Sequence, residues 1–550
     1  MKRNRLGQAL GVALATLVSG SALADGGQCY LHRDVSIERL LRRLSIDLRG
    51  VVPDAAEYDA VDGKDAIPDA ILQAYLSSDE FRLQMRRYHE DLLWTNPSAT
   101  LSEVGFGLST ATVGASTVYS VSSTTKRKLY RGGDGTHTCQ DKPQSALGYD
   151  AAGLPLTEPI GTDGVGPYRA EGWIDVHPYW EPDPQKTLRV CAFDAQTNAS
   201  YVLPAGDPDA GTHTCDDVFA ISKTAACGCG PNLDYCMLTT PVQTPVLAGM
   251  REQVLRLVDD YTDGTRPYSE MLTTRRMWIN GPLVHYFQYL GARQSLSRVQ
   301  DLHEAADGPL PALPFTAADT WVEVDRQAPH AGILTLPGYL LRFQTNRGRA
   351  NRYRIAFEGQ YFQPPSTKDT GCNKEGDDLT QRCVCRNCHS TLEPLAAYFG
   401  QFAEAGTTAM RDFAQSYPSY KACSASGPLI STAWCDRFYV PVADLVDPDI
   451  RPYKLKPLRF ADAAHPKVQP HFDAGPGELA QEDIASGLFH QVATRHMFEM
   501  LMKREANLDP TSPDFEGALI DQLAKDFQSH DNLKLLVQQL VSLPMYRRMP

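Results

Sequence analysis

The pentapeptide Cys385-Arg-Asn-Cys388-His389 constrains this chain more than any other stretch of it. Its C-x-x-C-H spacing is that of c-type haem attachment, in which two thiols reach the two vinyl groups of one porphyrin. The histidine that follows the second thiol then falls under the iron and binds it through a ring nitrogen. The sequence therefore predicts one covalent haem c, held by Cys385 and Cys388, with His389 as the proximal ligand of the iron.

Two alternatives to haem attachment stay open for this motif. Cys372 and Cys383 lie nearby, so these cysteines can belong to a disulfide knot. Together with His389 they can also form a Cys/His zinc site. We favour haem chiefly because the N-terminal residues predict export from the cytoplasm.

Residues 1–24 have the parts of a secretory signal peptide. A basic start is followed by a mostly apolar run over residues 6–18 and by Ala22-Leu-Ala24, which places small residues at the two cleavage-site positions. The run is too short to span a bilayer, and no later stretch reaches the roughly eighteen apolar residues that a membrane helix needs. We expect a periplasmic or extracellular protein with no transmembrane segment in its mature chain. Haem is attached to c-type proteins outside the cytoplasm, so the expected location of the protein is consistent with the motif.

The formal net charge is −13, and it is more negative still without the basic residues of the signal peptide. Such an acidic surface argues against nucleic acid and anionic membranes as partners, because both carry negative charge. A basic redox partner protein fits this charge.

Residues 97–240 differ from the rest of the chain in amino-acid composition and in hydrophobic pattern. Gly, Ser, Thr and short alternating runs predict strands and long loops, and export favours disulfides between the cysteines there. The pentapeptide Gly-Thr-His-Thr-Cys occurs twice, at 135–139 and at 211–215. Their two histidines and two cysteines leave a zinc site open as the alternative to disulfides.

Helical patterns occupy the remainder. A stripe of leucines over 37–48, closed by Gly50, predicts the first helix, and Ser77 to Glu80 form a capping signal for another, in which Met85 and His89 are interpreted as packing residues. The expected fold class is mainly α, with helical N- and C-terminal regions around a c-type haem segment and an inserted β/loop-rich, disulfide-stapled segment. The expected organisation is a signal peptide (1–24), an N-terminal helical domain (25–96), the insertion (97–240), a helical domain (241–365), the haem-attachment segment (366–440), and a Pro-rich linker with a C-terminal helical domain (441–550).

The sixth ligand of the iron has several candidates. Met410 is the nearest methionine downstream of His389. A helix expected near the C-terminus offers His490, His496 and Met497, with Met500 about one turn away. Each of these residues taken alone is more often a core or surface residue than a ligand.

A second expectation concerns the basic helix that precedes the haem motif, with arginines from Arg342 to Arg354. A run of arginines is normally a solvated face. Because this run lies about thirty residues before the motif, pairing with the haem propionates is the alternative.

Five segments of the chain, 41–53, 266–291, 332–365, 385–406 and 540–547, carry a resemblance to a known family. In these segments the chain resembles the cytochrome-like proteins first catalogued in planctomycetes, multi-domain proteins of unknown function with a single C-x-x-C-H motif. The resemblance covers most of the chain except the insertion, and Leu395-Ala departs from the glycine that the family usually has there. It implies a haem and an extracytoplasmic location, and it implies no particular reaction.

Three classes of function compete. The first is an exported mono-haem electron-transfer protein with both axial positions of the iron filled. The second is a haem-dependent oxidoreductase of the peroxidase or oxidase kind, whose sixth position stays open. The third is a non-catalytic, disulfide-rich extracellular binding or scaffold protein, in which the motif is merely structural. We favour electron transfer.

Overall fold

The computed structural model describes residues 34–97, 107–121, 124–198, 200–203, 205–206, 210–215, 224, 226–291, 309–361, 385–402, 406–407, 409 and 474–548. The expected signal peptide, Met410 and most of the expected Pro-rich linker lie outside these residues. The structure is 46% helical and 15% strand, so the expectation of a mainly α fold is wrong and the fold is mixed. The strands form several small local sheets. Short strands leave a weaker pattern in the sequence than the longer, regular apolar stripes of the helices, so the sequence predicts the helices more readily.

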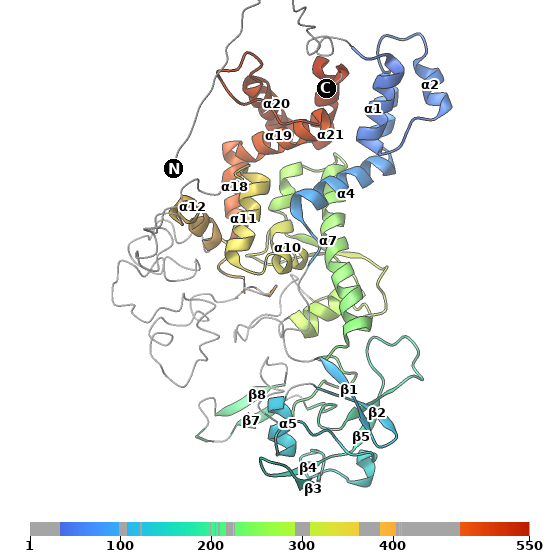
Figure 1. Ribbon diagram of the computed structural model, residues 1–550, viewed down its shortest axis with the longest axis vertical. Helices are drawn as coiled ribbons and strands as arrows, with labels where there is room; N and C mark the ends of the chain where they lie inside the picture. Colours follow the sequence, from blue (N-terminus) through green and yellow to red (C-terminus); the bar gives the residue numbers. More distant parts are fainter. Residues whose placement is uncertain are drawn as a thin grey trace, which may run out of the picture.

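Helices occupy both ends of the chain and its middle (Figure 1). The N-terminal helices are α1 (Ile37–Arg49), α2 (Ala55–Val61), α3 (Asp69–Leu76) and α4 (Asp79–Leu93). The middle ones are α7 (Thr244–Thr262), α8 (Gly281–His285), α10 (Pro337–Arg342), α11 (Asn346–Phe357) and α12 (Arg386–Ala397). The C-terminal ones are α18 (Pro476–Ser486), α19 (Leu488–Met502), α20 (Gly517–His530) and α21 (Leu533–Ser542). Shorter helical turns are η2 (Gln144–Ala146), η3 (Thr239–Gln243), η4 (Tyr268–Leu272), η5 (Tyr286–Leu290), η6 (Ile333–Thr335) and η9 (Pro544–Arg547).

The helix ends follow local capping chemistry. Asp54 accepts the backbone N–H of Glu57, whose carboxylate accepts the N–H of Asp54 in return, and this capping box starts α2. The Ser78 hydroxyl accepts the Phe81 N–H at the start of α4. Gly50 ends α1 in a left-handed conformation with φ 71°, which glycine adopts at little cost. The expected N-terminal helices are therefore confirmed.

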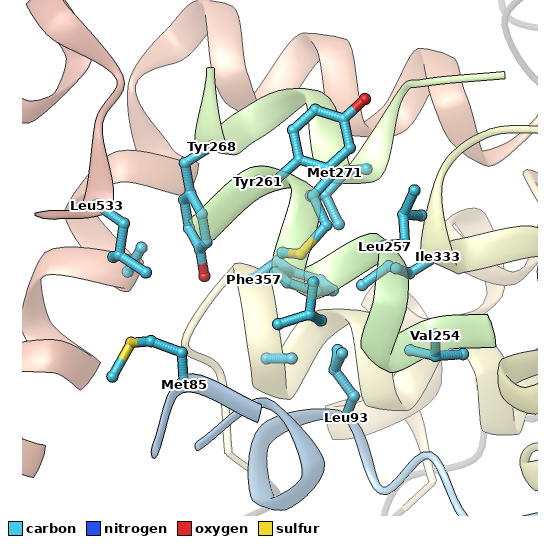
Figure 2. Close-up of a cluster of buried hydrophobic side chains, with 14 of the residues drawn as sticks. Met85, Leu93, Val254, Leu257, Tyr261, Tyr268, Met271, Ile333, Phe357 and Leu533 are labelled. Carbon is cyan, nitrogen blue, oxygen red and sulfur yellow. The ribbon is translucent and has the colours of Figure 1, made fainter. Parts of the chain in front are cut away.

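One hydrophobic core joins the three helical segments. Its buried side chains run from Leu40 in α1 to Tyr546 in η9. Figure 2 shows its centre, to which α4 contributes Met85 and Leu93, α7 contributes Leu257 and α11 contributes Phe357. Met85 is fully buried, as expected of a packing residue. We refer to the described parts of 34–97, 239–361 and 385–548 as the helical body.

The two ends of the helical body are joined directly. The backbone N–H of Val35 donates to the carbonyl of Arg547 at 3.0 Å. The Tyr546 hydroxyl donates to Asp47 of α1 at 2.8 Å. Because Tyr546 is fully buried, the first and last helical segments depend on one another.

Strands concentrate between residues 107 and 238, inside the expected insertion (97–240), and from here on the insertion means residues 107–238. They are β1 (Leu108–Val113), β2 (Ser116–Val121), β3 (Glu158–Thr162), β4 (Pro167–Ala170), β5 (Trp173–Val176), β6 (Leu188–Cys191), β7 (Ser200–Leu203) and β8 (Gly211–Thr214), with helix α5 (Thr124–Arg131) among them. The largest sheet has the order β1-β2-β6-β5, and the pairs β3-β4 and β7-β8 stand apart from it. A further pair, β9 (Arg276–Ile279) with β10 (Val322–Asp325), lies in the helical body.

The insertion lies at the opposite end of the molecule from α1 and α20 (Figure 1). Three disulfides cross-link it, Cys139–Cys191, Cys215–Cys227 and Cys229–Cys236. The expectation of a β/loop-rich, disulfide-linked insertion is thus confirmed. Contact with the helical body includes a stack of Tyr179 on His285, with ring centroids 3.5 Å apart.

A search of the described helices for a membrane span finds none with the required length and apolarity.

Candidate functional site

The C-x-x-C-H motif occupies the first turn of α12. The carbonyl of Cys385 accepts the N–H groups of Cys388 at 3.1 Å and His389 at 3.0 Å, so the turn is closed by backbone hydrogen bonds. Residues three and four positions apart lie on the same face of a helix. The local structure therefore brings the two cysteines and the histidine together on one side of α12. All three are half-buried, and neither thiol is in a disulfide bond.

The second half of α12 and the turn after it are fixed in the core. Ala396, Phe399 and Phe402 are fully buried, and the ring of Phe399 stacks on Tyr339 of α10. Helix α12 packs along α11, which precedes it in the chain. The motif thus stands at the partly open start of a helix whose remainder is anchored.

Helix α11 carries most of the arginines expected as a solvated face, and this expectation is wrong for three of them. Arg349, Arg352 and Arg354 are 0%, 6% and 5% exposed. Burial of a guanidinium is tolerated when its N–H groups find acceptors, and backbone carbonyls supply most of them here. Pairing of these arginines with haem propionates stays a prediction.

Arg349 fixes the turn that follows α12. Its guanidinium donates to the carbonyl of Phe402 at 3.2 Å and to that of Gly406 at 3.0 Å. It also donates to Leu340 and Phe343, at the end of α10. One buried side chain therefore ties together three segments around the motif.

Arg354 reaches α12 itself. Its guanidinium donates to the Thr391 hydroxyl at 3.3 Å, and that hydroxyl donates to the carbonyl of Cys388 at 3.1 Å. This chain of hydrogen bonds connects α11 to the second cysteine of the motif. Composition alone does not distinguish Arg354 from its neighbours, because only the register of α11 on α12 decides which arginine turns inward.

The sixth-ligand candidates on α19 have other partners. His490 is buried and its Nε2 lies 3.2 Å from Asp531 Oδ1. His496 Nε2 lies 3.2 Å from the Tyr361 hydroxyl, and burial lowers the pKa of His496 to about 4, with help from Arg495 and Arg352. Met497 is fully buried in the core.

The helix that carries these candidates is not a principal neighbour of the motif helix. Among the described elements, α19 packs mainly on α18, α20, α21 and α11, whereas α12 packs on α11. The helix of His490, His496 and Met497 and the helix of His389 thus share α11 as a neighbour and are not principal neighbours of each other. Met410, the remaining candidate, lies outside the described residues.

His89 also has a structural role. Its ring nitrogens lie 2.6 Å from the Met85 carbonyl and 2.9 Å from the Tyr268 hydroxyl, and its side chain is fully buried. Burial lowers the pKa of His89 to about 4. The expectation that Met85 and His89 are packing residues is confirmed.

An acidic pair beside α11, the half-buried Glu358 and the buried Asp483, has no signal in the sequence. Burial raises the pKa of Glu358, at the end of α11, to about 7, and the nearby Asp483 carboxylate adds to this effect. Burial also raises the pKa of Asp483, which accepts the Tyr353 hydroxyl at 2.6 Å. Nothing in the local sequence separates Glu358 from the exposed glutamates, because its surroundings come from α18.

The zinc alternative for the Gly-Thr-His-Thr-Cys copies is wrong. Cys139 and Cys215 are both in disulfides, so their thiolates cannot bind a metal. His137 instead forms a 2.8 Å contact with Asp163, near Asp134. The Asp163 carboxylate also accepts the backbone N–H groups of Val165 and Gly166, so internal hydrogen bonds account for this group.

Comparison of the chain with protein-family models, with curated proteins and with solved structures finds no match.

Proposed function

We propose that this protein binds one haem c covalently at Cys385 and Cys388, with His389 as axial ligand, and transfers electrons in the periplasm or at the cell surface. The bound group would supply one-electron redox chemistry. The acidic chain, with a net charge of −13, suits a basic redox partner that approaches by electrostatic attraction.

The contrast among the cysteines carries this proposal. In the part of the chain that the structure describes, six cysteines form three disulfides, while Cys385 and Cys388 remain thiols. Disulfides are typical of oxidising compartments outside the cytoplasm. In such a compartment, two half-buried thiols on one helical turn, followed at once by a histidine, fit covalent attachment to a porphyrin.

The anchoring of α12 supports electron transfer. A redox centre exchanges electrons readily when its surroundings change little between oxidation states, and a helix held by buried groups provides such surroundings. Arg349 holds the turn after α12, and Arg354 connects α11 to the turn that contains Cys388. These residues act on the protein frame and would limit movement of the helix that carries His389.

One observation favours the second candidate, a haem-dependent oxidoreductase with an open sixth position. His490 and His496 each direct Nε2 toward another residue, Asp531 and Tyr361, and neither belongs to a principal neighbour of α12. An open position binds small ligands such as cyanide or peroxide and gives a high-spin ferric iron.

Haem staining of a denaturing gel tests attachment. Wild-type protein, exported by a host with working c-haem machinery, should retain haem through denaturation, and Cys385→Ser/Cys388→Ser should not. The matched control is Cys139→Ser/Cys191→Ser, which removes two cysteines of the insertion and should keep the stain. An unstained wild type would instead support the scaffold function with a structural motif.

The ferric optical and EPR spectra then decide between the two haem functions. An electron carrier should be low-spin, and Met410→Ala should convert it to high-spin if Met410 is the sixth ligand. His490→Ala and His496→Ala should leave the spin state unchanged, because these residues are hydrogen-bonded elsewhere. A high-spin wild type that binds cyanide readily would favour the oxidoreductase.

A further inference from the structure

Helices α11 and α12 run antiparallel, which brings the end of α11 to the C-x-x-C-H motif. Arg349, near the start of α11, reaches the turn that follows α12, whereas Arg354, near the end of α11, reaches Thr391 in the first half of α12. The end of α11 therefore lies beside the turn that contains Cys388. Two ionisable side chains lie there one helical turn apart, Arg354 and Glu358.

Arg354 carries a buried positive charge. It is 5% exposed, and its guanidinium donates to the Thr391 hydroxyl at 3.3 Å and to Asn351 Oδ1 at 2.9 Å. Its Nε is buried without a hydrogen-bond partner, and among the described residues no carboxylate lies within ion-pair distance of its guanidinium. Because the interior screens charge weakly, this charge acts over a longer distance than a solvated one.

The guanidinium of Arg354 is two hydrogen bonds away from the motif. Thr391 accepts one of them and donates the other to the carbonyl of Cys388, at 3.1 Å. Thr391 follows Cys388 by three positions and His389 by two, so it lies within one helical turn of both. A haem held by Cys388 and His389 would therefore be attached to the part of α12 that this charge contacts.

Glu358 provides a countercharge to Arg354 only when it is ionised. Burial and then the Asp483 carboxylate raise the pKa of Glu358 to about 7, against the opposite effect of Arg354. At about pH 6 the carboxyl is mostly neutral and leaves the charge of Arg354 uncompensated, and at about pH 8 it is mostly ionised and offsets that charge. The net charge at this end of α11 thus depends on pH.

The other groups around Glu358 come from α11, α18 and α19. Burial also raises the pKa of Asp483, but the 2.6 Å hydrogen bond from Tyr353 opposes this shift, so Glu358 is the carboxyl expected to titrate near neutral pH. Burial holds the pKa of Tyr353 well above its ordinary value. Arg495 of α19 donates to the carbonyl of Gly359, and an arginine keeps its charge throughout this range.

Charges beside a haem shift its reduction potential, because the ferric form carries one more positive charge than the ferrous form. A nearby cation disfavours the ferric form and raises the potential, and a nearby carboxylate lowers it. We infer that Arg354 and Glu358 couple the reduction potential of the haem to pH, with Arg354 raising the potential and ionised Glu358 lowering it. This inference rests on the proposed haem function. An electron from the redox partner would then favour binding of a proton from water by Glu358, because the two equilibria are linked.

Spectroelectrochemical titration of the haem-loaded, full-length protein at about pH 6 and about pH 8 tests this coupling. At the lower pH, Arg354→Gln should reduce the equilibrium constant for one-electron reduction about tenfold, which lowers the midpoint potential by ~59 mV. Arg354→Lys keeps the charge and should stay close to the wild type. Glu358→Gln is the matched control, because it replaces a mostly neutral carboxyl at this pH and should leave the potential unchanged.

Between the two pH values, the potential of the wild type should fall further than that of Glu358→Gln, which cannot ionise. Haem staining of every protein comes first, and a wild type without haem would refute the proposed function together with this inference. With haem in place, the inference alone is refuted if Arg354→Gln leaves the potential unchanged, or if Glu358→Gln shifts it equally at the lower pH. If Arg354→Gln does not retain haem, the pH profiles decide, and identical profiles for the wild type and Glu358→Gln would overturn the coupling.

Discussion

The helical body and the insertion are stabilised in different ways. The helical body buries one continuous set of apolar side chains contributed by both ends and the middle of the chain. The insertion has smaller apolar clusters, and four of the twelve buried residues in its larger cluster are cysteines in disulfides. Small strand-rich segments bury too little surface to hold themselves, so covalent cross-links replace part of the missing core.

The cysteines extend this comparison to function. All described cysteines of the insertion are consumed in cross-links, while the two described cysteines of the helical body stand unpaired at the start of α12. The same residue type therefore forms cross-links in one region and is left as free thiols in the other, where we propose haem attachment. The predictions below test this division, beginning with the largest expected effect.

Truncation of the shared core should have the largest effect. Phe357 is 2% exposed and lies against Tyr353 and Phe489. Phe357→Ala should lower the free energy of unfolding by about 3–5 kcal/mol, because it removes apolar contacts and leaves a cavity. Chemical denaturation measures this change, and Leu535→Ala, at a side chain that is 42% exposed, serves as the control. Equal effects of the two substitutions would contradict a single core.

Loss of a disulfide should affect the insertion alone. Cys139→Ala/Cys191→Ala removes a cross-link between residues 52 positions apart. It should lower the free energy of unfolding of the insertion by about 2–4 kcal/mol. Limited proteolysis should then cut first between residues 107 and 238, and reductant should reproduce the result on the wild type. If reduced and oxidised samples resist protease equally, the insertion has a sufficient core of its own.

Removal of Arg349 should loosen the segment after α12. Arg349→Leu removes the hydrogen-bond donor of the buried carbonyls of Phe402 and Gly406. The free energy of unfolding should fall by about 1–3 kcal/mol. Hydrogen exchange should accelerate in α12 and leave the insertion unchanged. The exposed Arg39→Leu on α1 is the matched control, and unchanged exchange in α12 would show that Arg349 does not anchor it.

The smallest effect concerns pH. The pKa of Glu358 rises to about 7 from an ordinary value of 4.5, so between these values the folded protein holds a proton that the unfolded chain has lost. Stability from this group is therefore present below pH 4.5 and is lost as the pH rises through about 7. Glu358→Gln should flatten the pH dependence of the melting temperature between pH 5 and 8, and the exposed Glu80→Gln should not. Identical profiles for the wild type and Glu358→Gln would contradict this role.

Local patterns in the sequence predicted the features that depend on neighbouring residues. The leucine stripe of α1, the capping signal around Ser78, and the disulfide-linked insertion all follow from short-range spacing or composition. Two expectations failed because they depend on tertiary contacts. The arginines of α11 are buried because α12 and α4 cover them, and the overall class is mixed because small sheets form from short, weakly patterned strands.

In the candidate site, too, the features set by local sequence could be predicted and those set by tertiary packing could not. The closeness of Cys385, Cys388 and His389 follows from helical spacing, and the structure places them on one turn. The position of α19 follows from packing among α18, α20 and α21, which no local pattern encodes. The sequence could therefore offer His490 and His496 only as candidate ligands, and in the structure both have other hydrogen-bonding partners.

The mass of the intact protein tests the central proposal most directly. Wild-type protein from a host that attaches c-type haem should be heavier than its processed polypeptide by one haem. Cys385→Ser/Cys388→Ser should show only the mass of the polypeptide, and Cys139→Ser/Cys191→Ser should keep the added mass. A wild type without this addition, from a host that loads a known c-type cytochrome in parallel, would contradict covalent haem at Cys385 and Cys388.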